Sequence, residues 1–254
     1  MTIKEYYNDQ YLTKCKGKVL KITEEGVIFD KTVAFPEGGG QEGDSGALTE
    51  LKTGNIVNFT YTTKCGGRKL ELEGFHSISV ETDVIHHIEE KELEKVNIGD
   101  EYEITLNVER RAKITLYHTG IHIVLMAIER LRPKIQDKIF GAKISDHSAR
   151  LDFRTSDKFE ANELKEISNI VNEIIKEDRE IKVFPHEIEK EALYWKCDQF
   201  INPCGGTHLT RTCFLGEVSL KRKGIGKDAE RIIATFNNYT LPLKLYHESI
   251  EGEG

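Results

Sequence analysis

The sequence predicts an α+β protein: a small N-terminal β-barrel domain over residues 1–108, followed by an α+β domain over residues 109–254 in which helices pack on an antiparallel sheet. Two observations support this class. The first hundred residues contain short segments in which apolar and polar residues alternate, separated by glycines, as in the strands of a barrel. After Arg111 the apolar residues recur at helical spacing, and strand patterns return later without alternating regularly with helices.

The first domain is predicted to contain strands at 17–22, 55–61, 68–73 and 100–108. The last is the clearest, because Tyr102, Ile104 and Leu106 alternate with polar residues. One face of this strand is therefore expected to be buried and the other solvated.

The second domain is predicted to contain two helices. The first starts after Arg111 and carries an apolar stripe that stops before Pro133, whose ring disfavours helical geometry at the preceding residue. The second covers residues 159–175. Strand patterns flank these helices at 151–153, 181–184, 214–220 and 232–236.

Charge and cysteine content limit the classes of function. The chain of 254 residues carries 36 basic and 43 acidic side chains, a net charge of −7, so any contact with RNA must use a local basic patch. Five cysteines without regular spacing are typical of free thiols in a reducing compartment. The sequence has no secretory leader pattern and no run of membrane-spanning length, so we expect a cytoplasmic protein that contacts no membrane. The oligomeric state stays open.

Two pairs of residues have the spacing of metal ligands. His118 and His122 are four residues apart in the predicted helix, which places both imidazoles on one face. Cys204 and His208 are also four apart. Three imidazoles and one thiolate suit Zn²⁺, whereas Mg²⁺ or Ca²⁺ would call for carboxylates and carbonyls. The sequence therefore predicts a zinc site formed by these four residues.

Spacing alone leaves open which cysteine supplies the thiolate and whether the zinc would be structural or catalytic. Gly205 and Gly206 are expected to allow the tight backbone path that turns a thiolate and an imidazole toward one point. Cys213, and less readily Cys197, is an alternative to Cys204. A zinc ion with four protein ligands is also typical of a structural site, because catalytic sites keep one position open.

Three sequence blocks carry a resemblance to a known family. They are HTGIH from His118, CGGTH from Cys204, and the glycine-rich segment FPEGGGQEGDSG from Phe35. Together they resemble the editing domain of alanyl-tRNA synthetase and its freestanding relatives, the AlaX proteins. Further matching fragments lie at 109–111, 150–153, 223–227 and 230–232, so the resemblance covers nearly the whole chain.

The resemblance implies a zinc-dependent hydrolase that removes a wrong amino acid from tRNA specific for alanine by cleaving its ester. Serine is the expected amino acid and glycine the second choice. No His, Asp or Glu in the motifs is an evident general base, so the catalytic residues are left unassigned. Two other functions stay open: a zinc-stabilised tRNA-binding module without hydrolysis, and a metal-dependent hydrolase of a small ester or amide.

Two sets of contact residues are expected, the substrate contacts from the resemblance and the tRNA contacts from the distribution of charge. Substrate contacts are expected from the glycine-rich loop and the surroundings of the metal, namely Gln41, Asp44, Ile121, Gly205, Gly206 and Thr207. Contacts with tRNA phosphates are expected from the densest basic run and from the start of the first helix, namely Lys221, Arg222, Lys223, Lys227, Arg110 and Arg111. Each set also has a purely structural alternative. The glycines would form a plain turn, the basic run would be a solvated hairpin tip, and Arg110 and Arg111 would pair with carboxylates.

Overall fold

The computed structural model describes residues 1–75 and 77–248, which form two compact units. The first contains Met1–Gly38, Gly43–Arg111 and the residues from Pro242 on; the second contains Gly39–Glu42 and Ala112–Leu241. Each unit has its own buried apolar core. No helix among the described residues is long and apolar enough to span a membrane.

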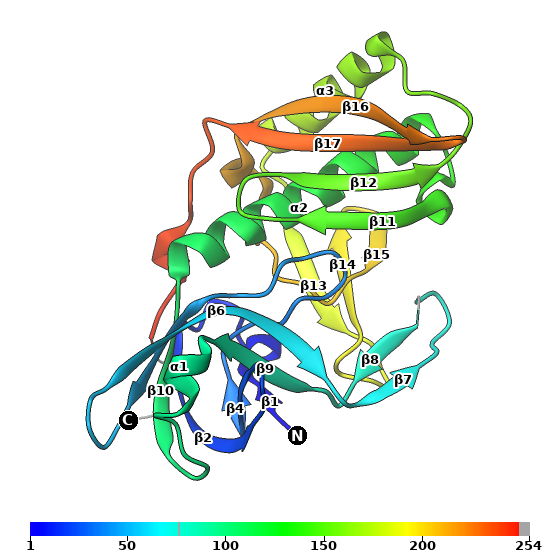
Figure 1. The fold of residues 1–254 in the computed structure, drawn as a ribbon. Coiled ribbons are helices and arrows are strands. Elements are labelled where there is room, and N and C mark those ends of the chain that lie inside the picture. Colours follow the sequence, from blue (N-terminus) through cyan, green and yellow to red (C-terminus); the bar gives the residue numbers. More distant parts are fainter. Residues whose placement is uncertain (76, 249–254) are drawn as a thin grey trace. The chain divides into compact units, whose positions relative to one another are not determined.

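The first unit is built on a closed antiparallel barrel, which confirms the predicted N-terminal architecture (Figure 1). Its strands follow the order β10-β2-β3-β9-β6-β5 around the barrel. Their bounds are β2 Lys14–Ile22, β3 Gly26–Phe29, β5 Gly46–Glu50, β6 Ile56–Cys65, β9 Asp83–Ile88 and β10 Glu101–Leu106. Shorter elements complete the unit: β1 Ile3–Lys4, η1 Glu5–Tyr7, β4 Lys31–Thr32, β7 Arg68–Leu70, β8 Ile78–Val80, α1 Glu90–Leu93 and η4 Leu243–Leu245.

The predicted strand 100–108 is shorter in the structure because a helix starts within it. The side chain of Asn107 accepts the N–H of Arg110 at 3.1 Å, and its carbonyl accepts the N–H of Arg111 at 3.0 Å. An Asn at this position satisfies helical N–H groups that have no partner within the helix. Helix α2, Val108–Leu131, therefore begins earlier than the apolar periodicity indicates.

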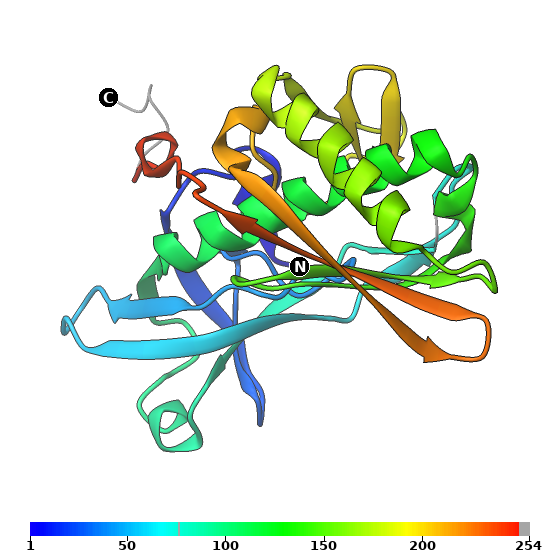
Figure 2. The ribbon, with the colours of Figure 1, turned by 90° about the horizontal axis from the view of Figure 1, so that it is seen from above.

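The second unit contains a four-stranded antiparallel sheet in the order β11-β12-β17-β16. Its strands are β11 Ile139–Ile144, β12 Ala149–Arg154, β16 Glu217–Gly226 and β17 Ala229–Asn237. Helices α2 and α3, the latter Ala161–Lys176, lie on the same side of this sheet (Figure 2). Their buried residues form one core with alternate residues of β12 and β17, which confirms the predicted α+β class.

A second, three-stranded antiparallel sheet supplies the segment that carries the Cys-His pair. It consists of β13 Ile181–Pro185, β14 Leu193–Cys197 and β15 Phe200–Pro203. Only the first of these strands is predicted from the sequence, because β14 and β15 are short and joined by a tight turn. Two short 3-10 helices complete the unit, η2 Ile135–Lys138 and η3 Thr212–Leu215, and η3 shortens the strand predicted at 214–220.

A fully buried imidazole, that of His86 on β9, lies inside the barrel unit. Its Nδ1 contacts the carbonyl oxygen of Val27 at 3.3 Å, and its Nε2 contacts the hydroxyl of Thr32 at 2.8 Å. The ring packs edge-on against Phe29 and Phe59. Burial, as the largest cause, lowers the pKa of His86 to about 4, so the ring is neutral at pH 7.

We expect His86 to make the protein sensitive to mild acid. Because its pKa is about 4 when folded and about 6.5 when unfolded, the unfolded chain takes up a proton first as the pH falls below 6.5. The free energy of unfolding should then fall by about 2 kcal/mol between pH 7.5 and pH 5 through this residue alone. Denaturant titrations over this range should show a shallower pH dependence for His86→Gln than for the wild type. His87→Gln is the control, and equal slopes for wild type and His86→Gln would contradict the assignment.

Candidate metal centre

Helix α2 supplies the first two predicted ligands. His118 and His122 are nearly fully buried, and their rings stack with centroids 5.1 Å apart. Between them, Gly120 lets the helix lie directly on the sheet, because a Cβ there would be 2.3 Å from the ring of Phe236 on β17. The helix is thereby fixed against the core at the turn that carries both imidazoles.

The segment after β15 supplies the other two predicted ligands, Cys204 and His208. The N–H of Cys204 donates to the carbonyl of Leu193 at 2.8 Å, so the chain is still paired with β14 where the thiol emerges. The Sγ of Cys204 lies 3.3 Å from His118 Nε2 and 3.2 Å from His208 Nε2.

All four residues converge as the spacing predicted. One ligand atom from each of His118, His122, Cys204 and His208 lies within 4.8 Å of the others. Ligands at about 2.0–2.3 Å from a tetrahedral zinc ion are about 3.3–3.8 Å from one another. The alternative thiols lie outside this cluster, with Cys197 buried and Cys213 exposed.

The tautomer of His118 is fixed by a second residue, Gln41. The backbone N–H of Thr207 donates to Gln41 Oε1 at 3.0 Å, and since an amide N–H can only donate, this oxygen is an acceptor. His118 Nδ1 lies 2.6 Å from the same oxygen and must therefore carry the proton. The lone pair of His118 is left on Nε2, which faces the thiol of Cys204.

Hydroxyl groups tie the Cys-His segment to α2. Thr207 Oγ1 accepts from Gln41 Nε2 at 3.1 Å and lies 2.7 Å from Thr115 Oγ1. Thr119 Oγ1 accepts the N–H of Leu209 at 2.8 Å. The buried polar groups on both sides of His208 are thereby paired, which keeps the segment in one register on the helix.

His122 is held by an aromatic and an amide. The indole of Trp195, fully buried on β14, stacks on the His122 ring at 4.9 Å with an angle of 19° between planes. The amide nitrogen of Asn202 lies 3.3 Å from His122 Nδ1. Trp195 thus lies in the core, whereas Tyr194 is half-buried.

Burial makes all four candidate ligands uncharged in the absence of a cation. It lowers the pKa of His118 and of His208 well below the usual value and that of His122 to about 3. It raises the pKa of the Cys204 thiol to about 12. The neutral imidazoles offer the lone pairs that metal binding requires, whereas the thiol of Cys204 has to lose its proton when a cation binds.

The two glycines of the Cys-His segment have different surroundings. A Cβ on Gly206 would be 2.2 Å from His118 Cε1 and 2.5 Å from Gln41 Oε1, whereas a Cβ on Gly205 would be 3.8 Å from its nearest neighbour. Neither has positive φ. The expected role in a tight backbone path is therefore corrected: Gly206 is required for space beside His118.

Asp44 and Arg111, both in the first unit, form a buried ion pair. Arg111 is fully buried, its Nε contacts both carboxylate oxygens of Asp44, and it donates to the carbonyls of Val33 and Gln10 at 2.8 Å. Asp44 also accepts the N–H of Phe35 at 2.7 Å. The pair closes the base of the glycine-rich segment, so this geometry favours carboxylate pairing over the predicted roles of Asp44 in substrate contact and of Arg111 in tRNA contact.

The other predicted contact residues lie in different settings. Arg110 is half-buried and donates to the carbonyl of Gly43 at 2.6 Å. Ile121 is buried in the core of the second unit. Lys221, Arg222 and Lys223 lie within strand β16, not at a hairpin tip. The remaining lysine of the run, at position 227, is exposed in the turn that follows β16.

Strand geometry divides this basic run. Arg222 turns toward Glu230 on β17 and forms two hydrogen bonds with its carboxylate, whereas Lys221 and Lys223 extend from the opposite side of the strand. Successive residues of a strand face opposite sides, which explains the separation.

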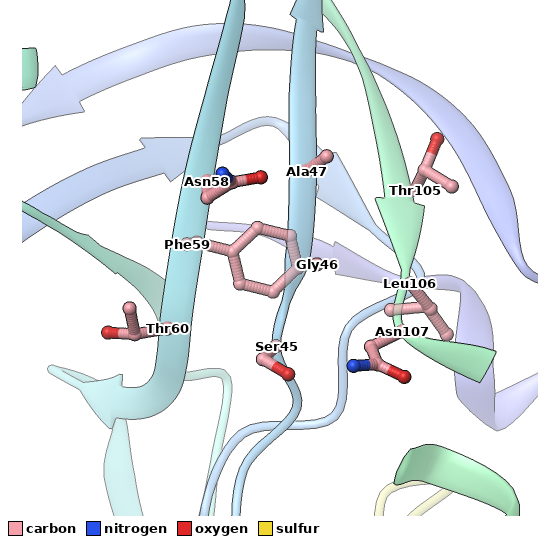
Figure 3. Close-up of a pocket in the computed structure, with 9 residues that line it drawn as sticks. All are labelled: Ser45, Gly46, Ala47, Asn58, Phe59, Thr60, Thr105, Leu106 and Asn107. Carbon is pink, nitrogen blue, oxygen red and sulfur yellow. The ribbon is translucent and has the colours of Figure 1, made fainter. Parts of the chain in front are cut away.

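An open hollow of about 510 Å³ lies in the barrel unit between β5, β6 and β10 (Figure 3). Its polar lining consists of hydroxyls and amides, from Ser45, Asn58, Thr60, Thr105 and Asn107. None of the residues that line it has an ionisable side chain, so it offers no side chain for proton transfer near neutral pH.

Comparison with known proteins points to one class, proteins that carry an alanyl-tRNA editing region. The chain is 29% identical over 240 residues to an alanine–tRNA ligase of Saccharolobus islandicus. This match covers 86% of the chain and 25% of the ligase. It is 29% identical over 248 residues to the ligase of Pyrococcus furiosus. The chain thus spans about a quarter of the length of these ligases.

A freestanding protein matches over nearly its whole length. The chain is 29% identical over 235 residues to the alanyl-tRNA editing protein AlaX-M of Pyrococcus horikoshii, covering 91% of this chain and 96% of that protein. No model of a protein family matches the chain. The similarity to AlaX-M and to the ligases confirms the resemblance that the motifs predicted.

The contrast between the two glycines gives a matched test of the centre. Gly206→Ala should lower Zn²⁺ affinity by at least about tenfold, because the new methyl group displaces His118 or Gln41. Gly205→Ala should bind as the wild type does. Competition with a chromophoric chelator measures both, with circular dichroism as a check of folding. Equal affinities for the two variants would show that His118 is not a ligand in the position described.

Proposed function

We propose that this protein is a trans-editing hydrolase that deacylates tRNA specific for alanine when it carries the wrong amino acid, with serine the main substrate and glycine the second. The observation that carries the proposal is the buried cluster of three histidines and one cysteine, in a chain similar to AlaX-M over nearly all of both proteins. A synthetase pocket discriminates by only about 1–3 kcal/mol against a slightly different side chain, so a separate hydrolytic site improves accuracy.

The cluster fits a zinc ion. Three neutral imidazoles and a thiol that becomes a thiolate on binding are the donors that Zn²⁺ accepts in tetrahedral geometry. When bound, the ion would polarise the ester carbonyl, hold the amino acid's amine or hydroxyl, or lower the pKa of a water molecule. We favour substrate holding together with orientation of the water.

Residues around the cluster orient two of the candidate ligands, His118 and His122. Gln41 keeps the Nε2 lone pair of His118 directed into the cluster, and Trp195 fixes the plane of His122. Cys204 is the one member of the cluster that is partly exposed, so substrate would approach from its side. Gln41, Trp195 and Asn202 carry no carboxylate or other evident base, and we assign no residue to proton removal.

One observation favours a second candidate, a zinc-stabilised tRNA-binding module without hydrolysis. Four converging protein ligands fill a tetrahedral shell, which is the arrangement of structural zinc sites. The two functions predict different effects on activity and folding when one metal-ligating residue is replaced. A hydrolase with a large apolar core loses activity and keeps its fold, whereas a structural centre unfolds.

Purified protein should bind about one Zn²⁺ per chain and release serine, and more slowly glycine, from tRNA specific for alanine, while leaving alanine attached. Cys204→Ala and His122→Ala should reduce deacylation by more than the roughly 10–100-fold that loss of an outer-shell partner costs. Their circular dichroism should stay that of the wild type. Elemental analysis, acid-gel separation of charged tRNA and thermal melts measure the three properties. Unfolding of both variants would instead support the structural-zinc module.

The basic run should contribute to tRNA binding. Lys223→Glu with Lys227→Glu should weaken binding and flatten its salt dependence, because each lost phosphate contact lowers the slope of log K against log salt by about one unit. A matched control reverses Lys165 and Lys176, which are exposed on α3. Filter binding at several salt concentrations gives both quantities. Unchanged affinity and slope in the first variant would leave the run as solvated surface.

A further inference from the structure

The four-stranded sheet of the second unit has one side in the core and one side exposed. On β12, Ala149, Leu151 and Phe153 are buried against the helices, so Arg150 and Arg154 lie on the other side. The same alternation and the strand register place further cations on this outer face, one on β11, one on β17 and two on β16: Lys143, Arg231, Lys221 and Lys223.

These cations form rows across the sheet. Lys143 pairs with Arg150, which pairs with Ile233, which pairs with Lys221. In the adjacent row, Asp152 pairs with Arg231, which pairs with Lys223. Cations from all four strands thus lie on one surface.

The centre of the surface is pre-organised. Asp152 accepts two hydrogen bonds from Arg231, at 2.6 and 2.9 Å, and a third from Arg150. The carboxylate is nearly buried, while both arginines keep about a quarter of their side-chain surface exposed. A carboxylate between two guanidinium groups reduces their freedom without cancelling their charge, which is favourable for binding an anion.

The face is positive in a chain whose net charge is −7. Besides Asp152, two carboxylates lie at its margins: Glu42, which is 3.5 Å from Lys143, and Glu217 at the start of β16. Phe140, half exposed on β11, lies under the guanidinium of Arg154 at 5.5 Å. With cations in rows and a single exposed aromatic ring, the face suits a phosphate backbone better than unstacked bases, which need several aromatic platforms.

We propose that this outer face, centred on the Arg150–Asp152–Arg231 cluster, is the surface that docks the phosphate backbone of the double-helical part of tRNA. The inference rests on the proposed function for its partner, and it adds the surface and the mode of binding. Recognition through this face is independent of base sequence, because guanidinium and ammonium groups on a sheet contact phosphates along the helix. Arg222 takes no part, since it lies on the opposite side with Glu230.

The test compares two double variants with the same change in charge. Arg154→Glu with Lys221→Glu changes the face and leaves Asp152 with both arginines, whereas Lys165→Glu with Lys176→Glu changes exposed positions on α3. We expect the first to raise the Kd for uncharged tRNA specific for alanine by about tenfold or more at low salt and to reduce the salt slope by about two units. The second should bind as the wild type does.

Two outcomes would overturn the proposal: unchanged binding by the face variant, or equal weakening by both variants, which would reflect bulk charge. Deacylation of seryl-tRNA by the wild type is measured separately. A wild type that binds tRNA but releases no amino acid would refute the hydrolase and leave the docking surface supported. A wild type that deacylates, paired with a face variant that binds normally, would refute the surface alone.

Discussion

One hydrogen bond, from the backbone N–H of Thr207 to the side-chain oxygen of Gln41, orients the Gln41 amide and, through it, the His118 imidazole of the candidate metal centre. It determines which end of the Gln41 amide accepts, and therefore which nitrogen of His118 carries the proton. It also joins three parts of the sequence: the glycine-rich segment, helix α2 and the Cys-His segment. Gly206 has to be a glycine because any side chain there would occupy the space of this contact.

Burial sets the protonation states of the four candidate ligands. Burial favours the neutral forms of the four candidate ligands, which lowers the pKa of the imidazoles and raises that of the thiol. A cation that binds there gains a thiolate and three imidazole lone pairs, but must displace one proton from Cys204. The core that surrounds α2 is built from apolar side chains of two helices and two sheets, so we expect the fold to survive loss of one ligand, as a catalytic role of the centre requires.

The sequence predicted those features that depend on spacing and periodicity: the barrel, the α+β class and the four residues that converge. It failed where the reason lies in tertiary contact. Asp44 and Arg111 stand in motifs that resemble functional ones, yet each is the other's buried partner, and because they are 67 positions apart no local pattern identifies the pair. Strands β14 and β15 are too short to show periodicity. The role of Gly206 is visible only once His118 lies beside it.

The basic run on β16 shows that strand geometry can separate cations that the sequence suggests form one patch. In sequence, three consecutive cations suggest one patch, but alternation sends Arg222 to Glu230 and leaves Lys221 and Lys223 on the outer face. There they lie beside Arg231 on the adjacent strand β17 and in the same rows as Lys143 on β11 and Arg150 on β12, which are 70 or more residues distant and which no local run reveals. The charge that matters for a polyanion is the charge of a surface, so an acidic chain can still present a face suited to RNA.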